Sequence, residues 1–170
     1  MGLFSKKNNK PVEAIVFHLQ GLPNTGKNSQ CRVSEDEEFV KIEELEGFVN
    51  LKVKNTFKIA SDRIIAIESL TKENIKEKSK SVVGRGVTGG LLFGPAGMLL
   101  GGLSGTGTKK EVKKQYLLNI SYYGQSKNDI KNLIFNAPGV SALKMMKFVD
   151  NYNETHFENV TTNENGEIIL

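Results

Sequence analysis

The sequence predicts a mostly β (α+β) domain of short strands, closed by one amphipathic C-terminal helix. Two observations predict this class. Short apolar and β-branched segments follow one another from Glu13 to Asn136, and turn-forming residues separate them. One segment with helical periodicity comes after them, around residues 139–152. A third feature interrupts the strands, because residues 86–108 carry no charge and are rich in glycine.

The strands are expected where β-forming residues run between turn signals. In chain order they are residues 13–22, 30–34, 38–42, 48–53, 56–60 and 63–70, with 75–83 as one further strand. Residues 112–123 and 130–136 predict a long β-hairpin around the polar turn 124–129. Pro138 suits the start of the closing helix, whose apolar stripe is predicted to be Val140, Leu143, Met146, Val149 and Tyr152.

The length of 170 residues fits one domain with an elaboration. We expect a flexible basic arm at 1–11, the domain at 12–152 with an insertion at 84–108, and a polar tail at 153–170. The net charge of +4 is too mild to argue for nucleic acid. The single cysteine, Cys31, excludes an internal disulfide and a multi-cysteine metal site, which suits a cytoplasmic location. We expect no cofactor and no metal.

The uncharged segment has a regular glycine spacing. Glycines lie four residues apart at 86, 90 and 94 and again at 97, 101 and 105, which puts each set on one helix face. Pro95 interrupts the register between the two sets. The spacing predicts two short glycine-faced helices that fold against each other as a hairpin. The remaining alternatives are a hairpin that packs on its own domain and a glycine loop without fixed structure.

The hairpin is the expected functional part of the chain, because an exposed apolar segment of this kind needs a partner surface. We expect homo-oligomerisation, with docking at an anionic membrane surface on the inner face of the membrane as the close second. The hairpin residues are Gly86, Gly90, Leu91, Leu92, Phe93, Gly94, Pro95, Gly97, Met98, Leu99, Leu100, Gly101 and Gly105. The basic residues that would meet anionic headgroups are Lys78, Lys80, Arg85, Lys109, Lys110, Lys113 and Lys114.

No convincing catalytic set is present. Residues 21–29 nearly match the phosphate loop G-x-x-x-x-G-K-S/T, but Asn28 stands where the hydroxyl belongs. A degenerate nucleotide binder that uses Gly26 and Lys27 therefore stays an alternative, against a plain hairpin turn. His18 and Cys31 lie in apolar strands and are expected to be structural. The carboxylates of residues 35–38, 43, 44 and 46 are expected to form a solvated acidic face.

Four segments occur in a distinctive order: Phe17-His18-Leu19-Gln20-Gly21-Leu22, Cys31-Arg32-Val33, Phe57-Lys58-Ile59-Ala60 and Arg63-Ile64-Ile65-Ala66-Ile67. With them the chain resembles bacterial pleckstrin-homology-like domains over about residues 13–152. The glycine-rich stretch 83–97 is similar to an insertion in Gram-positive and phage members, and Tyr116–Ile120, Ile134-Phe135 and the helix are similar to their final strands and helix.

The resemblance implies a pleckstrin-homology-like β-sandwich or half-barrel capped by the helix, and a binding module that is not an enzyme. It carries over no catalytic residue. Its phage members also suggest another alternative, in which the protein is an accessory or anti-defence protein that sequesters a host factor. The sequence identifies no such host partner.

Overall fold

The computed structural model describes residues 12–36, 38–47, 49–71, 115–157, 161–162 and 168–169. Seven of the described strands form one sheet: β1 (Ala14–Gln20), β2 (Gln30–Asp36), β3 (Phe39–Glu46), β4 (Lys52–Ala60), β5 (Ile64–Leu70), β6 (Leu117–Tyr123) and β7 (Ile130–Asn136). A 3₁₀ turn, η1 (Ser61–Arg63), joins β4 to β5, and the helix α3 spans Val140–Phe157. The strands β8 (Thr161–Thr162) and β9 (Ile168–Ile169) pair separately.

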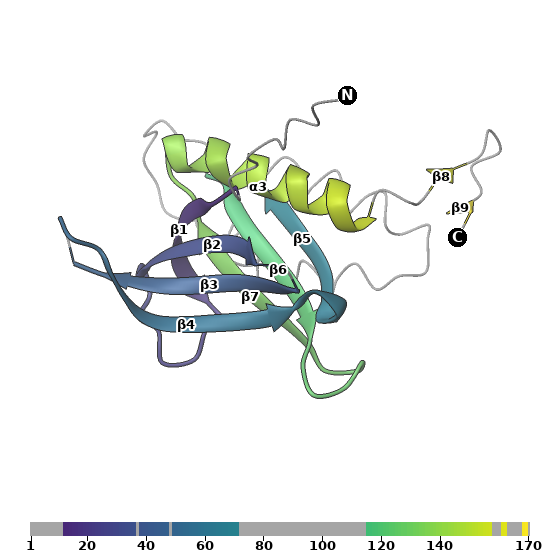
Figure 1. Ribbon diagram of the computed structural model, residues 1–170, viewed down its shortest axis with the longest axis horizontal. Coiled ribbons are helices and arrows are strands. Elements are labelled where there is room, and N and C mark those ends of the chain that lie inside the picture. Colours follow the sequence, from purple (N-terminus) through teal and green to yellow (C-terminus); the bar gives the residue numbers. More distant parts are fainter. Residues whose placement is uncertain are drawn as a thin grey trace, which may run out of the picture.

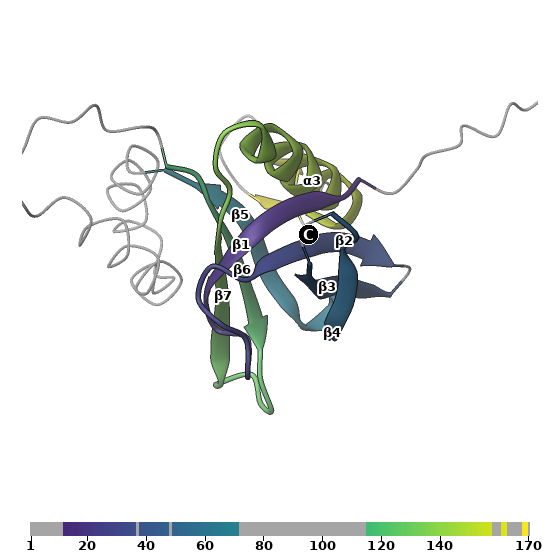
Figure 2. The same cartoon turned by 90° about the vertical axis from the view of Figure 1, so that its left-hand side faces the viewer.

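The sheet is antiparallel throughout, in the order β4-β3-β2-β1-β7-β6-β5. Strands β4 and β5 are its two edges. The sheet bends so strongly that the β1–β4 half lies over the β5–β7 half, and α3 runs along the opening between them (Figure 1). The helix packs against β1 and β5. Figure 2 shows the same arrangement along the helix.

The core lies between the bent sheet and α3. Alternate residues of each strand point into it, as the period of two requires. The helix contributes Ala142, Met145, Phe148, Val149 and Tyr152. At the β5 edge, Asn153 Nδ2 donates a hydrogen bond of 3.2 Å to the carbonyl of Ile67, so α3 also occupies part of that edge.

The two edges of the sheet differ in their local interactions. Arg63 donates two hydrogen bonds to the carbonyl of Tyr123, at 2.9 and 2.6 Å, and one to the carbonyl of Gly124. The β4 edge carries the lysines 52, 54 and 58, and its register with β3 skips Lys54, which is a β-bulge. Charged side chains and bulges on an edge strand oppose the addition of a further strand.

The predicted order of elements is confirmed for the described residues, while some bounds and details differ. The closing helix, predicted at 139–152, continues to Phe157, into the predicted tail. The predicted strands 48–53 and 56–60 are one strand, β4, that begins only at Lys52. The predicted apolar stripe of the helix is wrong at Val140 and Leu143, which are 75% and 66% exposed. The helix turns Ala142, Met145 and Phe148 inward instead, because these positions lie on the side of α3 that contacts β1 and β5. The predicted strand 75–83 and hairpin 84–108 lie outside the described residues.

We expect Phe148→Ala to lower the free energy of unfolding by about 3–5 kcal/mol, because the ring is 2% exposed and its removal leaves a cavity between α3 and the sheet. Urea denaturation followed by circular dichroism measures this. The matched control is Leu143→Ala on the same helix, which should change stability by less than about 0.5 kcal/mol. Equal effects for the two variants would contradict the observed orientation of α3.

Candidate functional site

The glycine-rich segment joins the described fold at the ends of β5 and β6. Leu70 at the end of β5 pairs with Leu117 at the start of β6, so the segment leaves and re-enters the sheet at neighbouring positions. The amide of Ala137, just before α3, donates a hydrogen bond of 2.9 Å to the carbonyl of Tyr116 beside this point. All the predicted hairpin residues (86–105) and basic flanking residues (78–114) lie outside the described residues, and their predicted roles stay predictions.

The β5–β6–β7 half of the sheet is buried on both faces. The pairing of Ile120 with Leu133 and Ile67 points these three side chains into the core. Their sequence neighbours point to the opposite side, which we call the outer face. Five side chains of the outer face are 0% exposed: Leu70, Leu117, Asn119, Ser121 and Ile134. An antiparallel sheet with a single core commonly leaves its second face to water. The side chains of the outer face are therefore buried as well.

A short polar ladder crosses the outer face. Asn119 Nδ2 donates to Ser121 Oγ at 3.1 Å, and Ser121 Oγ donates to Asn132 Oδ1 at 2.7 Å. Asn119 Oδ1 is buried and accepts no hydrogen bond from the described part of the chain. A buried acceptor without a donor is costly. The ladder thus gives an apolar surface one unfilled hydrogen-bonding position.

Another surface is apolar and exposed. The large hydrophobic side chains that are exposed in the described residues come from the β3–β4 turn and its flank and from the first turn of α3: Val49, Leu51, Val53, Val140 and Leu143. In Figure 1 both elements lie at the left end of the molecule, and this end faces the viewer in Figure 2. Exposed lysines at positions 52, 54, 144 and 147 accompany them. We call this surface the apolar–basic end.

Two glutamates of β3 are buried, and the predicted solvated acidic face is wrong for both. Glu44 is 2% exposed because the register turns it toward the core side, opposite Cys31 and Asn55. Asn55 Nδ2 donates to Glu44 Oε2 at 2.6 Å, and Lys54 Nζ lies 3.6 Å from Oε1. Glu43, on the other side of β3, pairs with Lys41 at 3.1 Å and Arg32 at 3.4 Å.

The charge of Glu44 is maintained by its partners. Burial alone raises the pKa of this carboxyl, but the hydrogen bonds from Asn55 and Ser29 and the charge of Lys54 outweigh it, so the net pKa is lowered. The neighbouring Cys31 is fully buried, which confirms its predicted structural role. Burial and the Glu44 charge raise the pKa of the Cys31 thiol to about 11, so it is not a reactive thiolate.

The β1–β2 turn, residues 21–29, is organised by His18. Its Nε2 accepts a hydrogen bond of 3.2 Å from the amide of Leu22, so the proton is on Nδ1, which donates to the carbonyl of Gly26 at 3.0 Å. Gly21 has φ +107°, and a side chain there would collide with the carbonyl of Asn132. The structural role predicted for His18 is confirmed.

The same turn contains the sequence that resembles a phosphate loop. A phosphate loop needs a following helix whose amides point at the phosphates. Here residues 30–36 continue as strand β2, which pairs with β1. The amide of Asn28 is already bonded to the carbonyl of His18 at 2.6 Å. The turn therefore joins the two strands of a β-hairpin, and its geometry does not support nucleotide binding.

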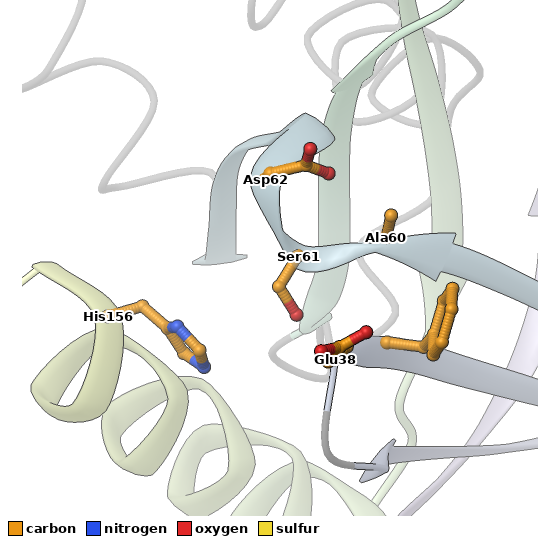
Figure 3. Close-up of a pocket in the computed structure, with 6 residues that line it drawn as sticks. Glu38, Ala60, Ser61, Asp62 and His156 are labelled. Atoms are coloured by element: carbon orange, nitrogen blue, oxygen red, sulfur yellow. The ribbon is translucent and has the colours of Figure 1, made fainter.

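A groove lies between α3 and the start of β3. Its volume is about 510 Å³, and its lining residues are Glu38, Phe39, Ala60, Ser61, Asp62 and His156 (Figure 3). His156 Nε2 lies 2.6 Å from Glu35 Oε1, and the ring stacks on Tyr152 at 4.3 Å. Burial raises the pKa of the Tyr152 phenol, with Ser61 opposing and Glu35 adding to the shift.

The groove contains a serine, a histidine and a carboxylate, but they do not form a catalytic triad. Ser61 Oγ makes no hydrogen bond to the ring of His156, although a triad requires this bond for proton transfer. The His156–Glu35 pair instead ties the end of α3 to β2. Among the residues that the structure describes, no cluster of three His, Cys, Asp or Glu side chains has a geometry that could hold a metal ion.

Within the described residues, no helix has the length and hydrophobicity needed to cross a membrane. Comparison with protein families gives one match that extends over residues 26–137, to the family described as "Glycine zipper containing PH domain". The match covers more than half of the 170 residues and includes the segment between β5 and β6. Neither the curated proteins nor the solved structures contain a match to this chain.

We expect Glu44→Gln to remove a pH-dependent part of the stability. Because the folded-state pKa of Glu44 is lowered, its ionisation stabilises the fold above the ordinary value of 4.5, and this contribution is lost as the pH falls through the folded-state pKa. Urea denaturation of wild type and variant between pH 7 and pH 3 measures this, with Glu46→Gln, at an exposed position, as control. Parallel stability curves for wild type and Glu44→Gln would contradict the inference.

Proposed function

Because the chain belongs to the family of PH domains that contain a glycine zipper, we propose that it is a non-enzymatic binding module that assembles with further copies of itself through the glycine-rich segment. PH-like domains are generally binding modules without catalysis. The observation that carries the proposal is the four-residue glycine spacing at 86, 90 and 94 and at 97, 101 and 105, in a stretch of 23 uncharged residues.

The glycine spacing supports close contact between helices. Small residues four positions apart form a groove without side chains, into which another helix backbone fits. Each glycine also costs about 1 kcal/mol of helix stability relative to alanine. A hairpin with six such positions would not hold its shape alone in water, so it needs a surface against which to pack. A second copy of the same segment offers the matching groove.

The point of insertion suits this role. The segment leaves the sheet beside the paired residues Leu70 and Leu117, close to the start of α3. The β4 edge, which is the other route to self-association, carries lysines and a bulge, and the β5 edge is partly occupied by Asn153. Extension of the sheet from copy to copy is thus disfavoured at both edges. Assembly through the inserted segment leaves the PH-like domain unchanged.

Docking at an anionic membrane surface is a second candidate, and the apolar–basic end favours it. Val49 is 86% exposed at the β3–β4 turn, next to Lys52 and Lys54. Leu143 and Lys144 lie side by side on the exposed side of α3. Apolar side chains would enter the interface while each lysine near anionic headgroups contributes about 1 kcal/mol. The basic residues predicted to flank the hairpin would add to this attraction.

We expect the double substitution Gly90→Leu with Gly101→Leu to abolish self-association, because side chains separate the helix backbones. Multi-angle light scattering measures the mass, and circular dichroism checks that the β-domain is folded. The alanine pair Gly90→Ala with Gly101→Ala separates the causes. Alanine favours helix but still fills the groove, so it should weaken association. If the alanine pair strengthens association, helix formation and not close packing of the helices determines assembly. A wild-type protein that does not self-associate would refute the proposal.

If the second candidate is correct, we expect the wild-type protein to float with anionic liposomes. The double substitution Leu51→Ser with Leu143→Ser should reduce this flotation, because both side chains are exposed at the apolar–basic end. Neutral phosphatidylcholine liposomes are the lipid control, and Lys127→Ser, in the exposed β6–β7 turn, is the protein control. Equal flotation of wild type and the double variant would exclude this end as the contact surface. No flotation of wild type would exclude the membrane candidate.

A further inference from the structure

The groove between α3 and the start of β3 has fixed walls and is not used by the proposed assembly. On the sheet side, Phe39 pairs with Ala60, and the amide of Ser61 donates a hydrogen bond of 2.8 Å to the carbonyl of Glu38. On the helix side, a contact of 2.6 Å with β2 holds the ring of His156 in place. Figure 3 shows the two sides facing each other. The volume of about 510 Å³ is in the range of ligand sites, so the groove is a preformed surface for a partner.

Two carboxylates of this groove carry negative charge that the described residues do not neutralise. Glu38 and Asp62 are exposed, and neither forms an ion pair within the part of the chain that the structure describes. Lys58 of β4 lies near the groove, but it is paired with Asp36 at 3.4 Å. Arg63, the sequence neighbour of Asp62, donates its hydrogen bonds to carbonyls of the β6–β7 turn instead. A partner for this groove therefore has to carry positive charge.

The apolar–basic end has the complementary chemistry. Lys52 and Lys144 are exposed there, and neither forms an ion pair with a described residue. Val49 and Leu51 lie beside Lys52, and Leu143 precedes Lys144. Apolar side chains beside lysines match a groove in which an aromatic ring lies beside two carboxylates. The two surfaces lie at opposite ends of α3, and the β3–β4 turn projects at the left end of the molecule in Figure 1.

We propose that the groove receives the apolar–basic end of a second copy, with the lysines of that end toward Glu38 and Asp62 and its apolar side chains toward Phe39. Because the two surfaces differ and lie at opposite ends of one molecule, the contact is head to tail. Each copy in a pair keeps one free groove and one free end, so further copies add in a row or close as a ring. The inference goes beyond the proposed function, because this contact uses none of the glycine-rich segment.

Sedimentation velocity of charge-reversed variants of the full chain tests the contact. One variant reverses the groove, Glu38→Lys with Asp62→Lys, and the other reverses the apolar–basic end, Lys52→Glu with Lys144→Glu. All four positions are exposed, so the fold is expected to tolerate these changes. Each variant alone should lose the contact, because like charges then face each other. An equimolar mixture should restore it, because the reversed groove matches the reversed end and the native groove matches the native end.

The variants are made in the Gly90→Leu, Gly101→Leu chain, which separates this contact from assembly through the glycine-rich segment. We expect this parent chain to be monomeric at the dilution of light scattering and to associate as its concentration approaches about 1 mM, the scale of a weak contact. Raising the salt concentration from about 0.05 M to about 0.5 M should weaken the association, because exposed charges are screened.

Two further variants complete the design. Glu13→Lys with Asp150→Lys changes the net charge by the same amount as the reversed groove, at exposed positions outside it, and should leave association unchanged. Glu38→Gln with Asp62→Asn removes the groove charges without introducing new ones. It should raise the dissociation constant about fivefold, and it replaces the reversed groove if that variant does not fold.

Each outcome decides the inference. A parent chain that stays monomeric overturns it, and so does a mixture that does not restore association. Equal loss of association in the control variant would assign the effect to net charge and also overturn it. Loss in the end variant alone, together with flotation on anionic liposomes, would assign the apolar–basic end to a membrane surface, again against the inference. A wild type that associates only at high concentration, and through the groove, would refute assembly through the glycine-rich segment and leave this contact standing.

Discussion

The packing of α3 into the opening of the bent sheet is the contact on which the rest of this structure depends. A seven-stranded antiparallel sheet with two free edges cannot enclose a core by itself, because β4 and β5 are not paired to each other. The helix closes the gap by burying Met145, Phe148 and Tyr152 among residues from both halves of the sheet. Asn153 and His156 then fix its second half, to the β5 edge and to Glu35 of β2. The packing of α3 thus determines which surfaces of the domain are left for binding.

Those surfaces differ in chemistry, so each of them suits a different kind of contact. The groove near His156 is lined by carboxylates, and its serine is not coupled to the histidine. The apolar–basic end offers exposed aliphatic side chains beside lysines. The outer face of the β5–β6–β7 half is apolar with one polar ladder, and it adjoins the insertion point of the glycine-rich segment. Insertion at this point, between two neighbouring strands, leaves the core intact.

Buried polar groups in the β1–β4 half fix its local geometry. His18 bonds to both sides of the β1–β2 turn, and Glu44 is held by Asn55 and Lys54 across the β3–β4 pair. A buried charge of this kind specifies register, because a shift by one residue would turn Glu44 outward and leave its partners unpaired. The turn that looks like a phosphate loop in sequence has its glycines and asparagines for conformational reasons: Gly21, Asn24 and Asn28 all have positive φ.

The sequence by itself determined the fold class, the order of the strands, the closing helix and the place of the glycine-rich insertion. These follow from local periodicity and turn chemistry, which need no knowledge of distant contacts. Only the tertiary structure decided which side of each element is buried. Val140 and Leu143 fit an inward stripe as well as Ala142 and Met145 do, and the contact with β1 and β5 selects the second pair. The inward position of Glu44 likewise depends on strand register, because the register is set by pairing between residues far apart in the chain.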